Sequence, residues 1–171
     1  MAGHADSERH GARVTPATKA LEAAGVAFTV HTYEHDPVNR DASAGWGKEA
    51  ADVLGLDRDQ VFKTLVVVAD GKPAVAIVPV SCQLSLKAAG AALGTKRVEM
   101  CDVTLAERTT GYVAGGISPF GQRKRLPTII DETCELYDEI YVSGGRRGLD
   151  IGLAPGDLIS HLSATVAPIT A

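Results

Sequence analysis

Residues 61–79 read VFKTLVVVADGKPAVAIVP, and this stretch decides the fold. Its first nine residues, Val61–Ala69, are mostly apolar and β-branched, which favours a buried strand. Asp70 and Gly71 form a pair typical of tight hairpin turns, and a second apolar run, Ala74–Pro79, follows them. The sequence therefore predicts a β-hairpin whose first strand is the strongest in the chain.

On either side of this hairpin, helix and strand patterns alternate. Thr15 followed by Pro16 is typical of a helix start, and Gly25 of a helix end. We expect helices over residues 16–24, 48–54, 84–93, 103–109 and 155–162, and strands over 26–33, 97–100, 126–131, 139–143 and 149–153, with a basic glycine turn over 144–148. This mixture predicts an α/β domain of the mixed α+β kind rather than a doubly wound parallel sheet.

Length and composition suit one domain. The chain has 171 residues, of which 45% are hydrophobic and 22% charged. We expect residues 1–14 to form a flexible arm and residues 15–171 one domain, and we expect a cytoplasmic location because no signal peptide or membrane-length apolar run is present. The net charge of −4 argues against a general nucleic-acid coat, so we expect no DNA and no membrane partner, but it leaves room for a local basic patch.

Cysteine and histidine spacings indicate neither a metal site nor a disulfide framework. Cys82, Cys101 and Cys134 are far apart and include no Cys-x-x-Cys pair, so reduced thiols are expected. His31 and His35 lie four residues apart, but in a strand-like pattern rather than on a helix. We expect no metal and no cofactor.

Lys63 stands out because it lies inside the strongest strand. Side chains alternate along a strand, so Lys63 shares a face with Val61, Leu65 and Val67. Burying an ammonium among these side chains is costly unless an anion pairs with it. Two readings stay open: a lysine whose amine reaches solvent at a strand edge, or a lysine at the mouth of a cleft that holds an anion or polarises a substrate.

A glycine-rich segment, residues 115–121 (GGISPFG), is the second candidate for chemistry. Paired glycines let a backbone approach a ligand closely and present its N–H groups to an anion or a developing oxyanion, although a purely structural turn has the same composition. Basic residues next to glycine-rich stretches suit a phosphate-bearing substrate or a solvated face; these are Arg123, Lys124, Arg125, Arg146 and Arg147. Asp150 is a lone acid in an apolar strand, and either closes a strand end or orients Lys63.

Several of these segments together resemble the YbaK/EbsC family. The resemblance covers about residues 15–169 and is carried by VFKTLVV, TGYVAGGISPFGQRKRLPTIID and IYVSGGRRGLDIGLAPGDL. That family belongs to the superfamily of prolyl-tRNA synthetase editing domains. Within the superfamily, the chain most resembles the Cys-tRNA(Pro) deacylase branch. The resemblance implies a single domain with a mixed, partly barrel-like sheet surrounded by helices, no metal, and hydrolysis of mischarged Cys-tRNA(Pro), with Cys-tRNA(Cys) as a further substrate.

The resemblance also implies roles for particular residues. It makes Lys63 the residue on which activity depends. It implies substrate contacts from Tyr33, Trp46, Thr64, Gly115, Gly116, Ser118, Ser143 and Asp150, and tRNA contacts from the five basic residues named above. The implied partners are the aminoacylated 3′ end of tRNA and prolyl-tRNA synthetase.

The implied mechanism uses the substrate's own thiol, which attacks its ester carbonyl while Lys63 anchors the substrate. Three alternatives stay open: an Ala-tRNA(Pro) or Ser-tRNA deacylase that activates water, a non-catalytic tRNA or synthetase adaptor, and a thiol-based redox or metal protein. Two stretches depart from the family pattern. The loop after residue 37 is longer and carries Trp46, and residues 81–85 read SCQLS.

Overall fold

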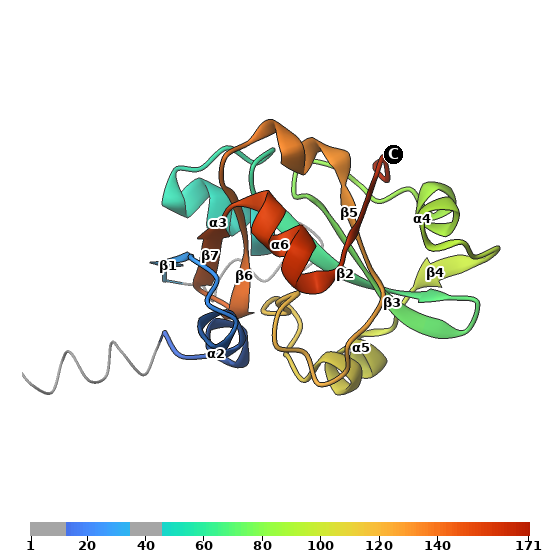
Figure 1. Ribbon diagram of the computed structural model, residues 1–171, viewed down its shortest axis with the longest axis horizontal. Helices are drawn as coiled ribbons and strands as arrows, with labels where there is room; N and C mark the ends of the chain where they lie inside the picture. The colour runs from blue at the N-terminus through green and yellow to red at the C-terminus, as the bar shows by residue number, and fades with distance from the viewer. Residues whose placement is uncertain (1–12, 35–45) are drawn as a thin grey trace, which may run out of the picture.

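The computed structural model describes residues 13–34 and 46–171, so residues 1–12 of the predicted arm and the loop over 35–45 lie outside the described residues. The elements run, in chain order, α2 (Pro16–Ala23), β1 (Thr29–Thr32), α3 (Trp46–Leu54), β2 (Phe62–Ala69), β3 (Lys72–Pro79), α4 (Leu86–Leu93), β4 (Val98–Met100), α5 (Val103–Thr110), β5 (Thr128–Asp131), the 3₁₀ helix η2 (Glu132–Leu136), β6 (Ile140–Arg146), β7 (Leu149–Leu153), α6 (Pro155–Leu162) and β8 (Thr165–Ala167) (Figure 1). The predicted mixed α/β class is confirmed.

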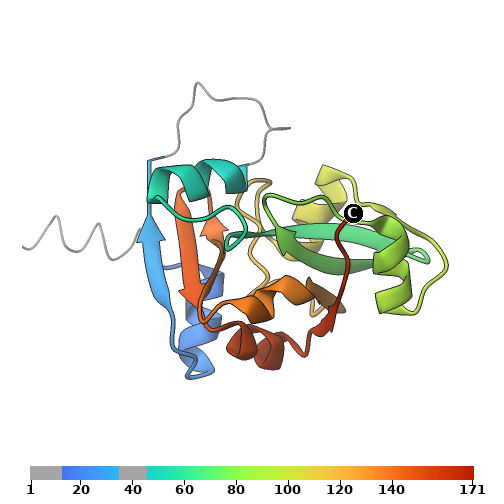
Figure 2. The same cartoon turned by 90° about the horizontal axis from the view of Figure 1, so that it is seen from above.

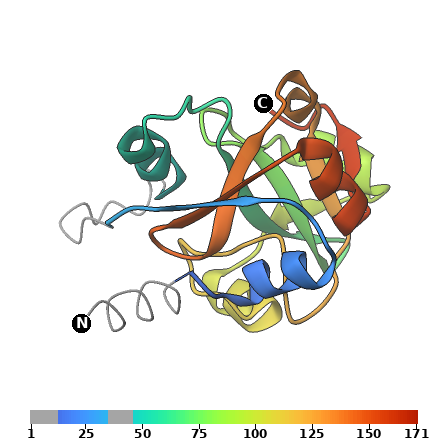
Figure 3. The ribbon, with the colours of Figure 1, turned by 60° about the vertical axis from the view of Figure 1, so that its left-hand side comes forward.

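The strands form two sheets that meet at β2. One is five-stranded with the order β4-β2-β3-β5-β8, and the other is three-stranded with the order β1-β7-β6. A parallel bridge between Val61 and Tyr141 joins them, so the start of β2 runs beside the start of β6. Figure 3 shows β6 beside the β2–β3 hairpin.

The predicted hairpin is present over its whole length. β2 and β3 pair antiparallel from Phe62 opposite Pro79 to Ala69 opposite Lys72. Asp70 and Gly71 both have positive φ, at 47° and 80°, which a two-residue hairpin turn requires. The carboxylate of Asp70 also accepts the backbone N–H groups of residues 96 and 97, and this ties the turn to the start of β4.

The predicted turn over 144–148 is wrong in extent. β6 continues through Gly144 and Gly145 to Arg146, with an irregularity in register between Ser143 and Arg146, so the turn is shorter. Glycines are frequent at such bulges because they accept unusual backbone angles, and pairing with β7 keeps the segment in the sheet. Two short elements, η2 and β8, were not predicted, since three to five residues carry too little pattern.

Apolar side chains form clusters on both faces of the three-stranded sheet. The largest cluster lies between this sheet, α2 and α6, and includes Phe62, Phe120, Ile151 and Leu158. A smaller cluster under α3 joins Ala51 to Val61, Val80 and Tyr141. Figure 2 shows α3 on one side of β1, β7 and β6, with α2 and α6 on the other. A third cluster packs α4 against the five-stranded sheet.

No helix within the described residues is long and apolar enough to cross a membrane.

One buried carboxylate helps to hold the C-terminal segment, in addition to backbone hydrogen bonds from Ser85 to Ile169 and from Ala171 to Gln83. Asp131 is 1% exposed, and one of its oxygens accepts the backbone N–H of Ile169 at 3.0 Å. Its other oxygen accepts the N–H and the hydroxyl of Thr133, at 3.2 and 2.6 Å. A single side chain thereby satisfies polar groups of η2 and of the chain end.

We predict that Asp131→Ala lowers the free energy of unfolding by roughly 2–4 kcal/mol, because the Ile169 N–H would be left buried without an acceptor. Urea denaturation monitored by circular dichroism measures the change. Asp138→Ala, at an exposed aspartate of the next loop, is the matched control and should change stability by less than about 0.5 kcal/mol. Equal effects of the two substitutions would contradict the assignment.

Candidate active site

Lys63 lies half-buried where the two sheets meet. It is two residues beyond Val61, whose bridge to Tyr141 joins β2 to β6, and it is paired across the hairpin with Val78. The start of α3 packs beside it: a Cβ on Gly47 would come within 4.0 Å of the Lys63 Cβ and 2.5 Å of the Val80 Cγ1. The strand and the helix together hold the base of the Lys63 side chain.

The amine of Lys63 has a cationic neighbour. Burial lowers the pKa of Lys63, the charge of Lys48 in α3 lowers it further, and Cys82 acts weakly in the opposite direction. No ion pair in residues 13–34 and 46–171 involves Lys63. Two ammonium groups close together in a partly dry place attract an anion, so this arrangement suits an anionic or electron-rich substrate group.

Polar side chains line the α3 side of the three-stranded sheet. Ser143 of β6 lies opposite Asp150 of β7, and Asp150 lies opposite His31 of β1. The His31 ring contacts the Tyr141 ring edge-on at 5.3 Å. Tyr141 also packs under α3 with Val61, and Val61 lies on the same face of its strand as Lys63. These polar groups and the base of the Lys63 side chain therefore lie on the same side of the sheets.

Asp150 interacts with Tyr33 rather than with Lys63. Asp150 is 5% exposed, and burial raises its pKa to about 7. Burial and the neighbouring charge of Asp150 raise the pKa of Tyr33 to about 12, with a smaller contribution from Glu49. The N–H of Tyr33 donates to the carbonyl of Gly148 at 2.9 Å, which places Tyr33 at the β6–β7 turn. The reading of Asp150 as a partner that orients Lys63 is therefore wrong.

Thr64 follows Lys63 and carries a buried hydroxyl that has no hydrogen-bond partner within the described chain. A buried hydroxyl without a partner is costly, and a ligand that supplies a donor or acceptor removes that cost.

The glycine-rich loop is held against β6. A Cβ on Gly116 would lie 2.6 Å from the Cα of Arg146, so only glycine fits there. The guanidinium of Arg147 donates to the carbonyl of Ala114 from Nε at 3.0 Å and from Nη2 at 2.8 Å. The N–H of Gly116 donates to Val113 at 2.9 Å, so it is not a free oxyanion donor. Gly115, with φ of 87°, retains the candidate donor of this pair.

Ser118 is a structural residue of this loop. It is fully buried, its Oγ accepts the N–H of Phe120 at 3.3 Å, and its carbonyl accepts the side-chain amide of Gln122 at 2.9 Å. The expectation that Ser118 contacts substrate therefore conflicts with its burial. Its hydroxyl shapes the turn that follows the paired glycines.

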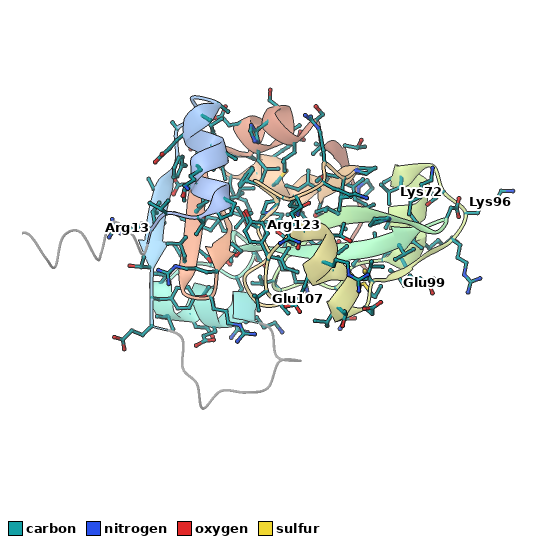
Figure 4. All side chains as sticks on the ribbon, turned by 90° about the horizontal axis from the view of Figure 1, so that it is seen from below. Arg13, Lys72, Lys96, Glu99, Glu107 and Arg123 are labelled. Atoms are coloured by element: carbon teal, nitrogen blue, oxygen red, sulfur yellow. The ribbon has the colours of Figure 1, made fainter. Side chains whose placement is uncertain are left out.

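The basic residues divide into two groups. Arg146 and Arg147 lie against the loop at residues 114–116, on the β6 side of the site. Arg123 crosses the end of α5, where a Cβ on Gly111 would meet its side chain at 2.9 Å, and Figure 4 shows it beside α5. Arg125 instead donates to Ser163 at the end of α6, at 3.0 Å. The side chains of Arg123 and Arg125 therefore lie on different surfaces of the domain.

Sequence reasoning missed the contribution of α3. It predicted the helix but assigned no role to Lys48 or Glu49, because nothing in the helix pattern indicates that its first turn packs beside Lys63. The side chain of Trp46, an expected substrate contact, lies outside what is described. Within residues 13–34 and 46–171, no group of three His, Cys, Asp or Glu side chains could hold a metal ion.

The described structure is therefore a mixed two-sheet domain with a half-buried, unpaired lysine where the sheets meet and a glycine-rich loop packed against β6. A model of the family described as "Aminoacyl-tRNA editing domain" matches residues 43–160, and the chain belongs to this family. It is an aminoacyl-tRNA editing enzyme, which cleaves the ester between an amino acid and tRNA.

Individual relatives agree with this membership. An Enterococcus faecalis protein assigned as the Cys-tRNA(Pro)/Cys-tRNA(Cys) deacylase EbsC is 41% identical over 124 residues, which are 72% of this chain and 76% of that protein. A proline–tRNA ligase of Citrifermentans bemidjiense is 32% identical over 88 residues, 52% of this chain and 15% of the ligase. A crystal structure described as a trans-editing enzyme for prolyl-tRNA synthetase superposes with a TM-score of 0.78 at 26% identity, covering 91% of this chain and 95% of the other.

We predict that Asp150→Asn stabilises the protein at pH 8 by roughly 2–4 kcal/mol. An aspartate ionises near pH 3.9 in the unfolded chain but at about 7 in the fold, so the folded state disfavours the charged form. The penalty is absent below pH 3.9, grows as the pH rises, and is complete above about 7. Denaturation of both proteins at pH 5 and pH 8 measures it, and an unchanged difference between the two pH values would contradict the buried neutral acid.

Proposed function

We propose that this enzyme hydrolyses mischarged Cys-tRNA(Pro), with Cys-tRNA(Cys) as a further substrate. The observation that carries the proposal is the half-buried amine of Lys63, unpaired within the described residues, in a member of the editing-domain family. The 41% identity to EbsC, whose name specifies these two substrates, supports the choice of cysteine.

The chemistry requires no nucleophile from the protein. The cysteine thiol loses its proton, and the thiolate attacks the ester carbonyl of its own residue. The carbonyl carbon–oxygen bond to the ribose then breaks, and the ribose oxygen takes up a proton. This releases tRNA and a four-membered cyclic thioester, which water opens to free cysteine. Holding the reacting atoms in position makes the attack intramolecular, an advantage that reaches roughly 7–11 kcal/mol in well-aligned cases.

Lys63 anchors the substrate and favours the thiolate. A thiol ionises near pH 8.5, and a nearby ammonium increases the fraction present as thiolate at neutral pH. The same amine attracts the terminal phosphate or ribose of the tRNA. Lys48 strengthens this field, because its charge lies close enough to lower the pKa of Lys63.

The surrounding groups supply hydrogen bonds. The backbone N–H of Gly115 is a candidate to contact the carbonyl or its oxyanion, and a lost donor of this kind typically costs a few kcal/mol of transition-state stabilisation. Ser143, Tyr33 and Asp150 form the polar wall on the α3 side and contact the amino acid or the ribose.

Selectivity for cysteine follows from reactivity. Serine has the shape of cysteine but is a much weaker nucleophile at neutral pH, and the alanine side chain has no nucleophilic group. A small pocket alone distinguishes side chains that differ by one methylene-sized group by only about 1–3 kcal/mol. The proposed mechanism therefore rejects Ala-tRNA(Pro) and Ser-tRNA by chemistry.

Prolyl-tRNA synthetase is the proposed partner in the cytoplasm. Proline–tRNA ligases contain a segment similar to this chain, and a structural relative is described as acting in trans for that synthetase. Recruitment by the synthetase would select the correct tRNA. A domain with a net charge of −4 binds the tRNA phosphate backbone weakly by itself.

We predict that Lys63→Ala folds normally but deacylates Cys-tRNA(Pro) roughly 100-fold more slowly or worse, because the substrate loses its anchoring charge. Lys72→Ala, at an exposed lysine at the other end of the hairpin, is the control and should retain full activity. Release of radiolabelled cysteine under single-turnover conditions measures the rates. A wild-type rate in Lys63→Ala would remove this residue from the site.

We predict that Cys-tRNA(Pro) is hydrolysed at least 100-fold faster than Ala-tRNA(Pro) or Ser-tRNA(Pro), with or without prolyl-tRNA synthetase. S-methylation of the bound cysteine should abolish cleavage, because the nucleophile is lost. Comparable rates for alanine and cysteine would instead indicate activated water, and tRNA binding without any turnover would indicate an adaptor.

A further inference from the structure

A polar cavity lies beside the end of α6. It has a volume of about 170 Å³ and opens between the loop after the paired glycines and the end of α6. Its polar lining comes from Gln122, Lys124, Arg125, Thr128 and His161. Nothing in the proposed ester cleavage uses this cavity.

The cavity presents donors and positive charge. Lys124 and Arg125 are exposed lysine and arginine side chains, and no carboxylate is among the lining residues that the structure describes. Arg125 uses one Nη2 contact for Ser163, at 3.0 Å, which positions its planar group at the rim. Arginine and lysine together suit the oxygens of a phosphate group.

The wall of the cavity is preformed. The His161 ring contacts the Phe120 ring edge-on at 5.7 Å, and Phe120 is fully buried in the main cluster. The Gln122 amide donates to Ser118, and the Thr128 hydroxyl donates to Leu126 at 3.1 Å, so both side chains are held in place. A ligand would therefore meet groups that are already ordered.

One feature of the cavity opposes an anion. α6 ends at its edge, and the carbonyls of a helix end amount to about half a negative charge. Two whole positive charges, from Lys124 and Arg125, outweigh it. The balance favours an anion with several oxygens over a neutral ligand.

The main apolar cluster separates this cavity from the candidate active site. α3, which packs beside Lys63, lies on the opposite side of β1, β7 and β6 from α6 (Figure 2). A small substrate cannot reach both places, whereas a tRNA is large enough to do so.

We infer that this cavity binds a backbone phosphate of the tRNA, at a distance from the ester that is cleaved. The source of the phosphate rests on the proposed function, while the cavity's affinity for phosphate does not. Bound there, the phosphate fixes the acceptor arm against the α6 side of the domain while its 3′ end enters the site at Lys63.

The test compares Lys124→Gln with Lys96→Gln in the full chain. Both remove one exposed positive charge, and Figure 4 shows Lys96 at one end of the molecule and Arg123, the chain neighbour of Lys124, near its middle. Fluorescence anisotropy with uncharged tRNA(Pro) over a NaCl series measures affinity without needing turnover. A ¹⁵N-HSQC titration with inorganic phosphate reports on the amides of Gly121, Gln122 and His161.

We expect Lys124→Gln to weaken tRNA binding roughly five-fold more than Lys96→Gln, and to reduce the slope of log K against log salt by about 1. Phosphate should shift the three cavity amides in the wild type and in Lys96→Gln, but not in Lys124→Gln. Equal losses in the two variants, or cavity amides that do not respond to phosphate, would overturn the inference.

Phosphate shifts that need Lys124, combined with unchanged tRNA affinity, would overturn the assignment to tRNA and identify a site for a small phosphorylated compound. Deacylation of Cys-tRNA(Pro) by the wild type is measured in parallel. Its absence would refute the proposed function without affecting the binding results.

Discussion

The pairing of β2 with two strands, together with the bridge that the residue before it makes to a third, is the constraint on which the rest of the structure depends. β2 pairs with β3 along its length and with β4 at its far end, and the residue before it bridges to β6. One apolar strand therefore sets the position of the two sheets relative to each other. The same geometry places Lys63 where the two sheets meet. There, one face of β2 is covered by α3 and not by the main apolar cluster.

Two ionisable groups near this junction are kept in unfavourable environments, and they are kept apart. Lys63 has a cationic neighbour, and Asp150 is buried beside a tyrosine. Direct pairing would relieve both groups and would also neutralise the amine. Because no such pair forms within the described residues, Asp150 does not neutralise the charge of Lys63. Unfavourable local electrostatics of this kind are common where binding or catalysis needs them, and the apolar clusters on either side of the sheet supply the compensating stability.

The glycine-rich loop could be located from its composition, but the roles of its residues could be predicted only in part. Gly116 is needed because the Cα of Arg146 lies where its side chain would be, and that contact joins residues thirty positions apart in the chain. The use of its N–H by Val113 and the burial of Ser118 depend on how the loop folds on itself. Motif resemblance named residue positions in this loop but gave no indication of which of their atoms already have hydrogen-bond partners within the fold.

Local pattern determined much of this protein. The hairpin over residues 61–79, most helix boundaries, and the unusual lysine follow from apolar alternation, capping residues and turn pairs, all of which act within a few residues. Only the tertiary structure decided that Asp150 lies beside Tyr33, that α3 brings Lys48 to Lys63, and that Lys124 and Arg125 border a cavity with His161. These relations depend on strand order and on helix placement over a sheet, and packing between distant segments sets both.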